Sequence, residues 1–426
     1  MDNIGRCCQN VYTYPVNRQK AIIAGSVGGF IIIVIVAIVL INSGGDSTVE
    51  TKVEGRHALK VTPLIVGENN IARNLKLYRK NKINEFNFVN AFKDGKWKKQ
   101  CKECVTDLES LGKGMIATQV FTVDVPCEAS FRDAVSLALE QIDVIERLLK
   151  KNAENIILAK ASKDIISIFR ANKLSGMIGL KGGHMIDSRL AVLRIFYKAG
   201  VRIMALTADC DTTWAVSHDF KKNSVNDTGL NDFGKLVISE MNRIGMIVDL
   251  SLSSKKTQLD AISLSEAPVI LSNVGAYDQA NVTQNIDGDV LEQIKKKKGL
   301  AMISFDPVLI KSGDVNLTNF IDHLNFLKQK VGEDCVGIGG NFDGFEDKIN
   351  GLESPQDIPK LFDTLKESGW TIEQLEKLAG NNFLRVMAAV EKTADLKSDK
   401  SPSEDYENKA TVIGNNTDCY SDWDQR

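Results

Sequence analysis

Polar side chains follow several short apolar runs in this sequence, at positions where chemistry is common in repeating strand and helix folds. Lys181 ends the apolar run 176–180 and precedes a pair of glycines, after which helical spacing resumes. This pattern predicts a strand, a turn and a helix, with Lys181 at the carboxyl end of the strand, where such folds place their sites. The other predicted strand ends carry Glu68 and Asn70, Ala208 with Asp209, Leu252, Asn273, Asp306, and Asn341 with Asp343.

These residue types restrict the chemistry that the strand ends can do. Catalytic zinc needs several histidine, cysteine or carboxylate ligands with an open position, and no histidine follows a predicted strand. A surface or packing role is therefore predicted for the four histidines. There is also no G-x-S-x-G, H-E-x-x-H or P-loop pattern. The histidines are His57, His184, His218 and His323.

The elements that must position these residues form a regular alternation of strand-like and helical stretches. Eight such units over 61–392 predict a (β/α)8 TIM-like barrel, an α/β fold, with an open doubly wound sheet as the alternative. The predicted strands are 63–67, 114–121, 176–180, 202–207, 245–250, 268–272, 299–305 and 336–339. The predicted helices include 131–150, 187–199, 317–331, 358–368 and 371–391.

Composition describes an ordinary globular protein with no charge signature for nucleic acid. The 426 residues are 43% hydrophobic and 25% charged, with a net charge of -2. Eight cysteines are too few for a fold built on disulfides. Cys101 and Cys104 form a single C-x-x-C, which predicts either a local disulfide or a pair of free thiols rather than a zinc site.

The amino-terminal region predicts a membrane anchor. Residues 21–41 carry no charge and are long enough to cross a bilayer, which favours a single-pass signal anchor over a cleaved signal peptide. Basic residues precede the span, so residues 1–20 are predicted to be cytoplasmic and the rest to lie outside the cell membrane, as in a type II protein. Residues 42–60 are predicted to be a stalk, and 393–426 a disordered polar tail.

Four glycosylation sequons agree with this orientation. Any one of them could arise by chance, but together with the charge asymmetry they predict a glycosylated ectodomain. The acceptor residues are Asn226, Asn281, Asn316 and Asn415.

Over residues 60–392 the sequence resembles the membrane (renal) dipeptidase family of zinc metallopeptidases, which are (β/α)8 barrels. Its motifs carry the resemblance: IGLKGGHMID resembles a strand ending in Glu-Gly-Gly-His, and VGIGGNFDG resembles Gly-Gly-Asp-Phe-Asp-Gly. Further similar segments are VGENN, LTADCDTTWA, MIVDLSLSS and APVILSNVGAY. The resemblance also implies a disulfide between Cys127 and Cys210.

Each of the six side chains that hold two zinc ions in the family is replaced here. The resemblance therefore implies that no metal is bound and that no catalytic residue remains. The first-strand His and Asp correspond to Glu68 and Asn70, the bridging Glu to Lys181, two later histidines to Leu252 and Asn273, and the Asp of the catalytic water to Asn341; the substrate-binding His and Arg correspond to Ala208 and Gln284.

These changes predict a membrane-anchored pseudoenzyme that works by binding a partner or ligand. Lys181 is predicted to replace the metal charge and to pair with Glu68 or Asp343, since buried carboxylates are otherwise costly. A homodimer, or a heterodimer with an active paralogue, is implied by the family. The alternative is a metallodipeptidase with a divergent site. A third hypothesis is a calcium site formed by Asp209, Asp211, Asp306 and Asp343. The favoured interpretation of these four residues is that they are scattered surface aspartates.

Overall fold

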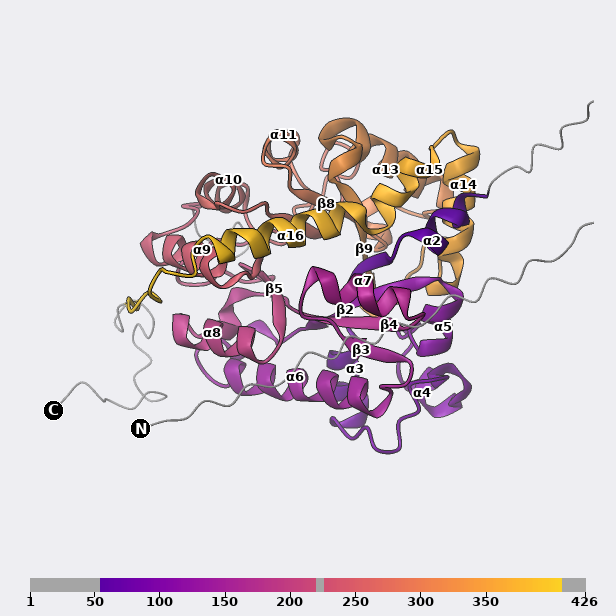
Figure 1. Cartoon of the computed structure of the whole chain (residues 1–426), viewed down its shortest axis with the longest axis horizontal. Helices are drawn as coiled ribbons and strands as arrows, with labels where there is room; N and C mark the ends of the chain where they lie inside the picture. Colours follow the sequence, from indigo (N-terminus) through magenta and orange to yellow (C-terminus); the bar gives the residue numbers. More distant parts are fainter. Residues whose placement is uncertain (1–53, 220–225, 408–426) are drawn as a thin grey trace, which may run out of the picture. The chain divides into compact units, whose positions relative to one another are not determined.

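The computed structural model describes residues 54–219 and 226–407, which form a closed parallel barrel surrounded by helices (Figure 1). All paired strands of the described residues run parallel. Their side chains are almost entirely buried, as expected for strands that are covered by helices. The strands are β1 Leu64–Asn69, β2 Ile116–Val123, β3 Ile156–Leu158, β4 Leu174–Leu180, β5 Val201–Ala205, β6 Ile247–Asp249, β7 Ile270–Val274, β8 Leu300–Ser304 and β9 Val336–Phe342.

The sheet closes through a direct pairing of β2 with β4, from Thr118 opposite Ser175 to Val123 opposite Leu180. The order β2-β1-β9-β8-β7-β6-β5-β4 thus returns to its start, and the predicted barrel is confirmed over an open doubly wound sheet. The short β3 pairs with the first residues of β4, while β5 pairs with the last ones. The strand β3 is therefore an addition to an eight-stranded barrel.

Helices cover the outside of the barrel and close its amino-terminal end. In Figure 1 the terminal helix α16 runs across the barrel, and its Phe383, Val386 and Met387 pack with Ile247 and Ile270 at the first residues of their strands. The carboxyl ends of the strands are left to form the opposite mouth, where TIM-type barrels place their sites. The α-helices are α2 Ala58–Val61, α3 Ile71–Arg79, α4 Gly95–Gln100, α5 Leu108–Lys113, α6 Ala134–Lys151, α7 Ser162–Arg170, α8 Leu190–Lys198, α9 Asp232–Ile244, α10 Lys255–Leu264, α11 Gly288–Lys296, α12 Pro307–Ile310, α13 Leu317–Val331, α14 Ile358–Glu367, α15 Ile372–Glu376 and α16 Asn382–Asp395. Single turns are η1 Gly55–His57, η2 Ala91–Lys93, η3 Cys127–Ala129, η4 Gly183–Ile186, η5 Glu333–Cys335, η6 Pro355–Asp357 and η7 Lys377–Asn381.

The eight predicted strands are all present, and the differences lie in connecting elements. The strand β3 is not in the prediction, because it has three residues and only Ile156 is buried. The single helix predicted at 371–391 is two helices, α15 and α16, joined by a π-helical turn at Lys377–Asn381. Gly380 in that turn packs so closely on the backbone oxygen of Pro63 that a Cβ atom would lie 2.1 Å from it.

Both ends of the described chain pack on the barrel. Residues 55–61, part of the predicted stalk, form η1 and α2, and Arg56 makes an ion pair with Asp363 of α14. At the other end, within the tail predicted to be disordered, the buried Glu407 carboxylate accepts a hydrogen bond from Asn231 Nδ2 at 3.1 Å. The folded unit therefore extends beyond 61–392 on both sides.

Two disulfides join described residues. Cys127 and Cys210 are bonded, as the family resemblance implies, and Cys101 and Cys104 form the local disulfide that was one of two readings of the C-x-x-C. Cys335 is a buried free thiol.

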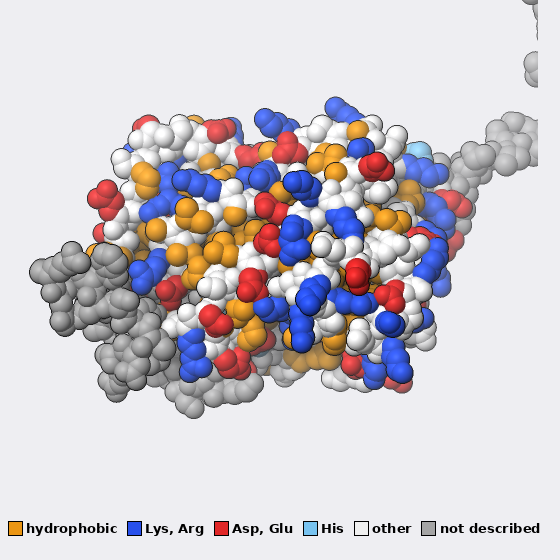
Figure 2. All heavy atoms as spheres, turned by 90° about the horizontal axis from the view of Figure 1, so that it is seen from below, with side chains coloured by type: hydrophobic (Ala, Val, Ile, Leu, Met, Phe, Trp, Pro, Cys, Tyr) orange, Lys and Arg blue, Asp and Glu red, His pale blue; other side chains and the backbone are white. Residues whose placement is uncertain are grey.

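The surface of the described residues carries both basic and acidic side chains. None of their helices is long and apolar enough to span a bilayer. Basic and acidic side chains lie side by side around a hydrophobic area on the face in Figure 2. The predicted span at 21–41 and the sequon at Asn415 lie outside the described residues.

The packing of η1 on α14 can be tested by replacing Gly55 with alanine. A Cβ atom at this position would lie 1.9 Å from the backbone oxygen of Phe362, so the backbone must move. We expect Gly55→Ala to lower the free energy of unfolding by about 1 to 3 kcal/mol, the usual cost of overpacking, measured by urea denaturation. Gly95→Ala is the matched control, because nothing lies within 4 Å of its Cβ position. Equal stability of the two variants would mean that residues 55–61 do not pack as described.

Candidate functional site

The carboxyl ends of the strands meet at one mouth of the barrel, and main-chain hydrogen bonds hold them in register. Asn70 N donates to Phe342 O at 3.2 Å, and Lys181 N donates to Val123 O at 2.9 Å. The predicted site residues Glu68, Asn70, Lys181, Leu252, Asn273 and Asn341 all lie at this end of the barrel, as expected for a parallel barrel.

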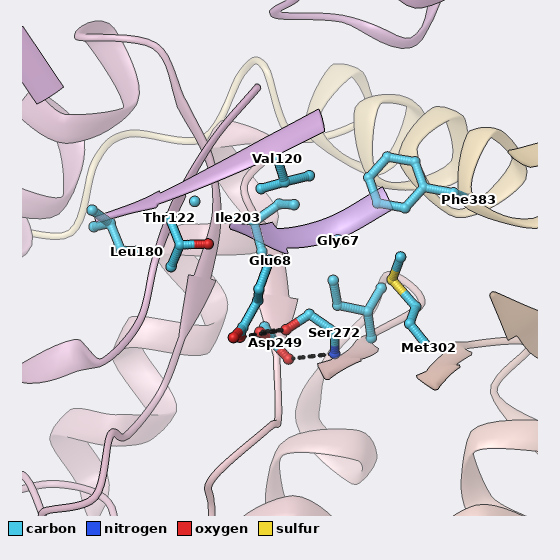
Figure 3. Close-up of a pocket in the computed structure, with 12 residues that line it drawn as sticks. Gly67, Glu68, Val120, Thr122, Leu180, Ile203, Asp249, Ser272, Met302 and Phe383 are labelled. Carbon is cyan, nitrogen blue, oxygen red and sulfur yellow. Dashed lines mark hydrogen bonds between the residues drawn. The ribbon is translucent and has the colours of Figure 1, made fainter. Parts of the chain in front are cut away.

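Glu68 is at the centre of the polar cluster at this end. Its side chain is 5% exposed, and its two oxygens accept hydrogen bonds from Ser272 Oγ at 3.2 Å and Asn273 Nδ2 at 3.3 Å. Figure 3 shows Glu68, Asp249 and Ser272 pointing toward one another, with Met302 and Phe383 on the other side of the same small cavity. Glu68 and Asn273, two positions that the sequence resemblance matches to family metal ligands, are thus joined directly.

A second buried carboxylate, Asp249, shares the Ser272 hydroxyl with Glu68. Its Oδ1 accepts from Ser251 N and Ser272 N, both at 3.0 Å, and its Oδ2 accepts from Ser272 Oγ. One hydroxyl has one proton, so it cannot donate to both carboxylates at once. Protonation of one carboxyl group would supply the missing donor.

Burial favours the protonated form of both carboxyl groups. Burial raises the pKa of Glu68 to about 7, because the ionised form loses its water; Lys181 opposes the rise, and the nearby Asp249 charge adds to it. Burial also raises the pKa of Asp249, but four hydrogen bonds from Ser251 and Ser272 work against that rise.

Lys181 provides the positive charge of the site without touching a carboxylate. Burial lowers the pKa of its ammonium group, but the negative charges of Asp124, Glu68 and Asp209 outweigh this and raise the pKa to about 12. Among the described residues, none of these carboxylates is close enough to Lys181 for a direct ion pair. The predicted pairing with Glu68 is therefore a longer-range attraction across the site.

Asp343, the other predicted partner of Lys181, belongs to a different group. Its Oδ1 accepts from Val105 N at 2.6 Å, and Lys348 supplies the nearby positive charge. Burial raises the pKa of Asp343 to about 6. Asp343 thus anchors the loop before α5 to the end of β9 instead of facing Lys181.

The asparagines at the site have unsatisfied acceptors. The Oδ1 atoms of Asn70, Asn273 and Asn341 are buried and accept no hydrogen bond. Asn341 has a positive φ of 71°, and Leu252, another replaced position, has a φ of 63°. Such strain in residues other than glycine is common at functional sites.

The remaining predicted positions are not joined into one site. Ala208 is buried beside Gly182, and Gln284 lies in the loop between β7 and α11. Within 54–219 and 226–407, no group of three or more His, Cys, Asp and Glu side chains could hold a metal ion, so the four aspartates of the calcium hypothesis do not form a cluster. Asp306 instead caps α12 through a 3.0 Å hydrogen bond from Val308 N.

The histidines have the packing roles that the sequence predicts. His184 Nε2 lies 3.1 Å from Val125 O, and His323 Nε2 accepts from Ala276 N at 2.7 Å. His218 is buried between Thr283 and Asp209. The structure describes no second histidine beside any of them that would make a metal site.

Three functional residues were missed in the sequence. Asp124 directly follows β2, but the predicted strand ends two residues earlier, at 121, so the strand-end rule did not reach it. Asp249 and Ser272 lie within predicted strands, and an acidic residue in an apolar strand is the signal that could have marked Asp249.

The fold and the position of the polar cluster define a TIM-type barrel protein with its candidate site at the carboxyl ends of the strands. Residues 57–401 match the family described as membrane dipeptidase (peptidase family M19). The chain belongs to this family.

Relatives and solved structures agree with this assignment. Dipeptidase 3 of Mus musculus is 35% identical over 348 residues, which cover 80% of this chain and 67% of the relative. Human Dipeptidase 3 is 32% identical over 368 residues, covering 86% and 72%. The probable dipeptidase PvdM of Pseudomonas aeruginosa has a similar fold, with a TM-score of 0.70 at 18% identity and coverage of 80% and 98%. A Rhodobacter sphaeroides metallopeptidase, solved with a phosphinate mimic of the dipeptide L-Ala-D-Ala, has a TM-score of 0.68 at 20% identity, covering 77% and 99%.

The donor set at the mouth does not fit the zinc of this peptidase family. Glu68 is the one carboxylate among the six corresponding positions, and Leu252 has no lone pair. Lys181 keeps its proton, because its pKa is raised to about 12, and an ammonium group repels a cation. Neutral amides are poor ligands for Zn²⁺, which is bound in proteins by thiolate, imidazole and carboxylate groups.

Replacement of Lys181 tests its role as the positive charge of the site. We expect Lys181→Glu to lower the free energy of unfolding by about 1 to 3 kcal/mol, because a carboxylate at this position repels the buried Glu68 where the ammonium group attracts it. Lys181→Arg keeps the charge and should lose less, and Lys296→Glu is the control at an exposed lysine. The measurement is thermal and urea unfolding; a Lys181→Glu variant as stable as the natural chain would contradict the role.

The raised pKa of Glu68 predicts a pH dependence of stability. The folded state binds a proton between the ordinary value of 4.5 and about 7, so this group makes the free energy of unfolding fall as pH rises through that range. We expect Glu68→Gln to reduce this slope, measured as melting temperature between pH 4.5 and 8. Glu292→Gln, at an exposed position, should leave the slope unchanged; an unchanged slope in Glu68→Gln would show that Glu68 titrates normally.

Proposed function

We propose that this protein is a membrane-anchored, dipeptidase-like pseudoenzyme that acts by binding a ligand or a partner protein at the cell surface. The observation that carries the proposal is the Lys181 ammonium group among Glu68, Asp124 and Asp209. A resident cation in the family site would compensate the charge of carboxylates at the mouth, and here a covalently attached cation stands near the buried Glu68. Asp124 also pairs with Arg73, and the Asp209 side chain is 66% exposed.

Repair from neighbouring residues is not supported by the geometry. The carboxylates closest to the replaced positions already have partners: Asp249 accepts from Ser251 and Ser272, and Asp343 accepts from Val105. Recruiting either one for a metal would break these buried hydrogen bonds, at a cost of about 1 to 3 kcal/mol for each group left unsatisfied.

The rest of the proposal concerns where the protein works and with what. The uncharged segment 21–41 would anchor it as a type II protein with the barrel outside the cell, carrying glycans on Asn226, Asn281, Asn316 and Asn415. The three sequon asparagines among the described residues are all exposed. A second copy of this chain or an active paralogue is the proposed protein partner.

The alternative function is zinc-dependent dipeptide hydrolysis by a divergent site. Its support is family membership and the 35% identity to Dipeptidase 3 of mouse. Family membership and fold do not specify the reaction when the residues of the site differ. Retained zinc distinguishes the two functions.

Zinc content is the decisive measurement. The full-length chain, purified without chelators from a glycosylating host and then supplied with zinc, is expected to retain no stoichiometric metal and to release no product from dipeptides. The matched control carries Glu68→His, Asn70→Asp, Lys181→Glu, Leu252→His, Asn273→His and Asn341→Asp, which restores the family donors. One or more tightly bound zinc ions in the natural chain would overturn the pseudoenzyme proposal.

A further inference from the structure

A groove of about 780 Å³ is formed by the loops that follow β7, β8 and β9. Its lining includes Val282, Val308, Lys311, Asn316, Asp347 and Asn350. Asp306, next to the groove in sequence, is within reach of the charges of both Lys181 and Lys348. The groove and the candidate site therefore lie at the same end of the barrel.

Hydrogen bonds between the loops make the groove a formed surface. Asn350 N donates to Val315 O, and Leu317 N donates to Asn350 O, both at 2.9 Å. The buried Asn285 joins the loop after β7 to the loop after β8 by donating from Nδ2 to Leu309 O at 2.8 Å. A ligand of this groove would meet walls that are already in place, which lowers the entropic cost of binding.

Two glycosylation sequons border this one groove. Asn316 of the sequon Asn316-Leu-Thr lines it, and Val282, the middle residue of Asn281-Val-Thr, lines it too. Asn281 and Asn316 are both exposed. The third described sequon, at Asn226, contributes no residue to the groove lining.

The local structure at Asn316 suits modification. Its Oδ1 caps α13 by accepting from Asn319 N at 3.0 Å, while its Nδ2 donates no hydrogen bond to a described residue. A sugar on Nδ2 leaves the oxygen free to keep the cap. In that modification the bond from Nδ2 to sugar C1 forms as the bond from C1 to a lipid diphosphate breaks, and the amide loses one proton.

We infer that the N-linked glycan on Asn316 lies in this groove and, together with the glycan on Asn281, covers this side of the barrel mouth. The lining fits a sugar chain: Lys311, Asp347 and Asn350 offer donors and acceptors for hydroxyl groups, and Val308, 57% exposed, offers an apolar surface for the C–H face of a ring. The inference rests on the extracellular placement in the proposed function. Its consequence is that ligands reaching Lys181 from this side must pass a carbohydrate layer.

The experiment compares variants that differ in the glycan but not in the helix cap. Thr318→Ala removes the sequon and keeps Asn316, whereas Thr318→Ser keeps both. Full-length proteins from a glycosylating host are analysed by glycopeptide mass spectrometry and by hydroxyl-radical footprinting of Val308, the exposed apolar side chain of the groove. We expect Asn316 to be occupied, and we expect oxidation of this side chain to rise several-fold in Thr318→Ala and to stay unchanged in Thr318→Ser. Thr228→Ala, which removes the sequon at Asn226, should leave the groove protected.

Two results would overturn the inference: an unmodified Asn316, or equal oxidation of the groove with and without the glycan. Zinc is measured on the same samples, so that the two proposals fail separately. Bound zinc contradicts the pseudoenzyme proposal whatever the glycan does, and an exposed groove in a zinc-free protein contradicts only the glycan.

Discussion

The long-range attraction between the Lys181 ammonium group and the surrounding carboxylates is the interaction on which the site depends. The barrel buries Glu68 and Asp249 where water cannot solvate them, and a buried carboxylate without compensation is costly. One lysine at the end of β4 serves Glu68, Asp124 and Asp209 from a distance. Because Lys181 touches none of them, its positive charge acts on all three. The buried charge of Glu68 and Asp249 is further reduced by the Ser272 hydroxyl between them and by the raised pKa of Glu68.

Hydrogen bonds from neighbouring loops hold a strained backbone conformation at the mouth. Leu252 holds a positive φ of 63°, and its carbonyl oxygen accepts from Thr207 Oγ1 at 2.8 Å and from His218 N at 2.9 Å. A branched residue in this conformation costs about 1 to 3 kcal/mol, so the neighbouring loops must hold it there. Both hydrogen bonds go to the main chain of Leu252, so they do not depend on which side chain stands at this position.

Sequence predicts the barrel well, because its strands are continuous apolar runs at regular spacing, but it predicts the site only in outline. The strand-end rule found Glu68, Lys181 and Asn273, which lie together at the mouth. It could not show that Asp343 faces Val105 instead of Lys181, because that contact spans 238 residues of the sequence. It also could not show the sharing of Ser272, which depends on the register of β7 beside β6. Residues 55–61 read as a stalk because their packing on α14 is equally distant in sequence.

The size of the interior constrains what the barrel can bind. The cavity beside Glu68 has a volume of about 10 Å³, close to the least that one water molecule needs, and Met302 and Phe383 line its other side. A ligand cannot enter the barrel itself, so recognition must use the rim above Glu68 and Lys181 and the loops around it. Loops tolerate substitution better than the strands they connect, so changes at the rim have little cost to the fold. The loops after β7, β8 and β9 form the groove in which we place the Asn316 glycan, so a ligand that approaches the rim from that side meets carbohydrate before it meets Glu68 and Lys181.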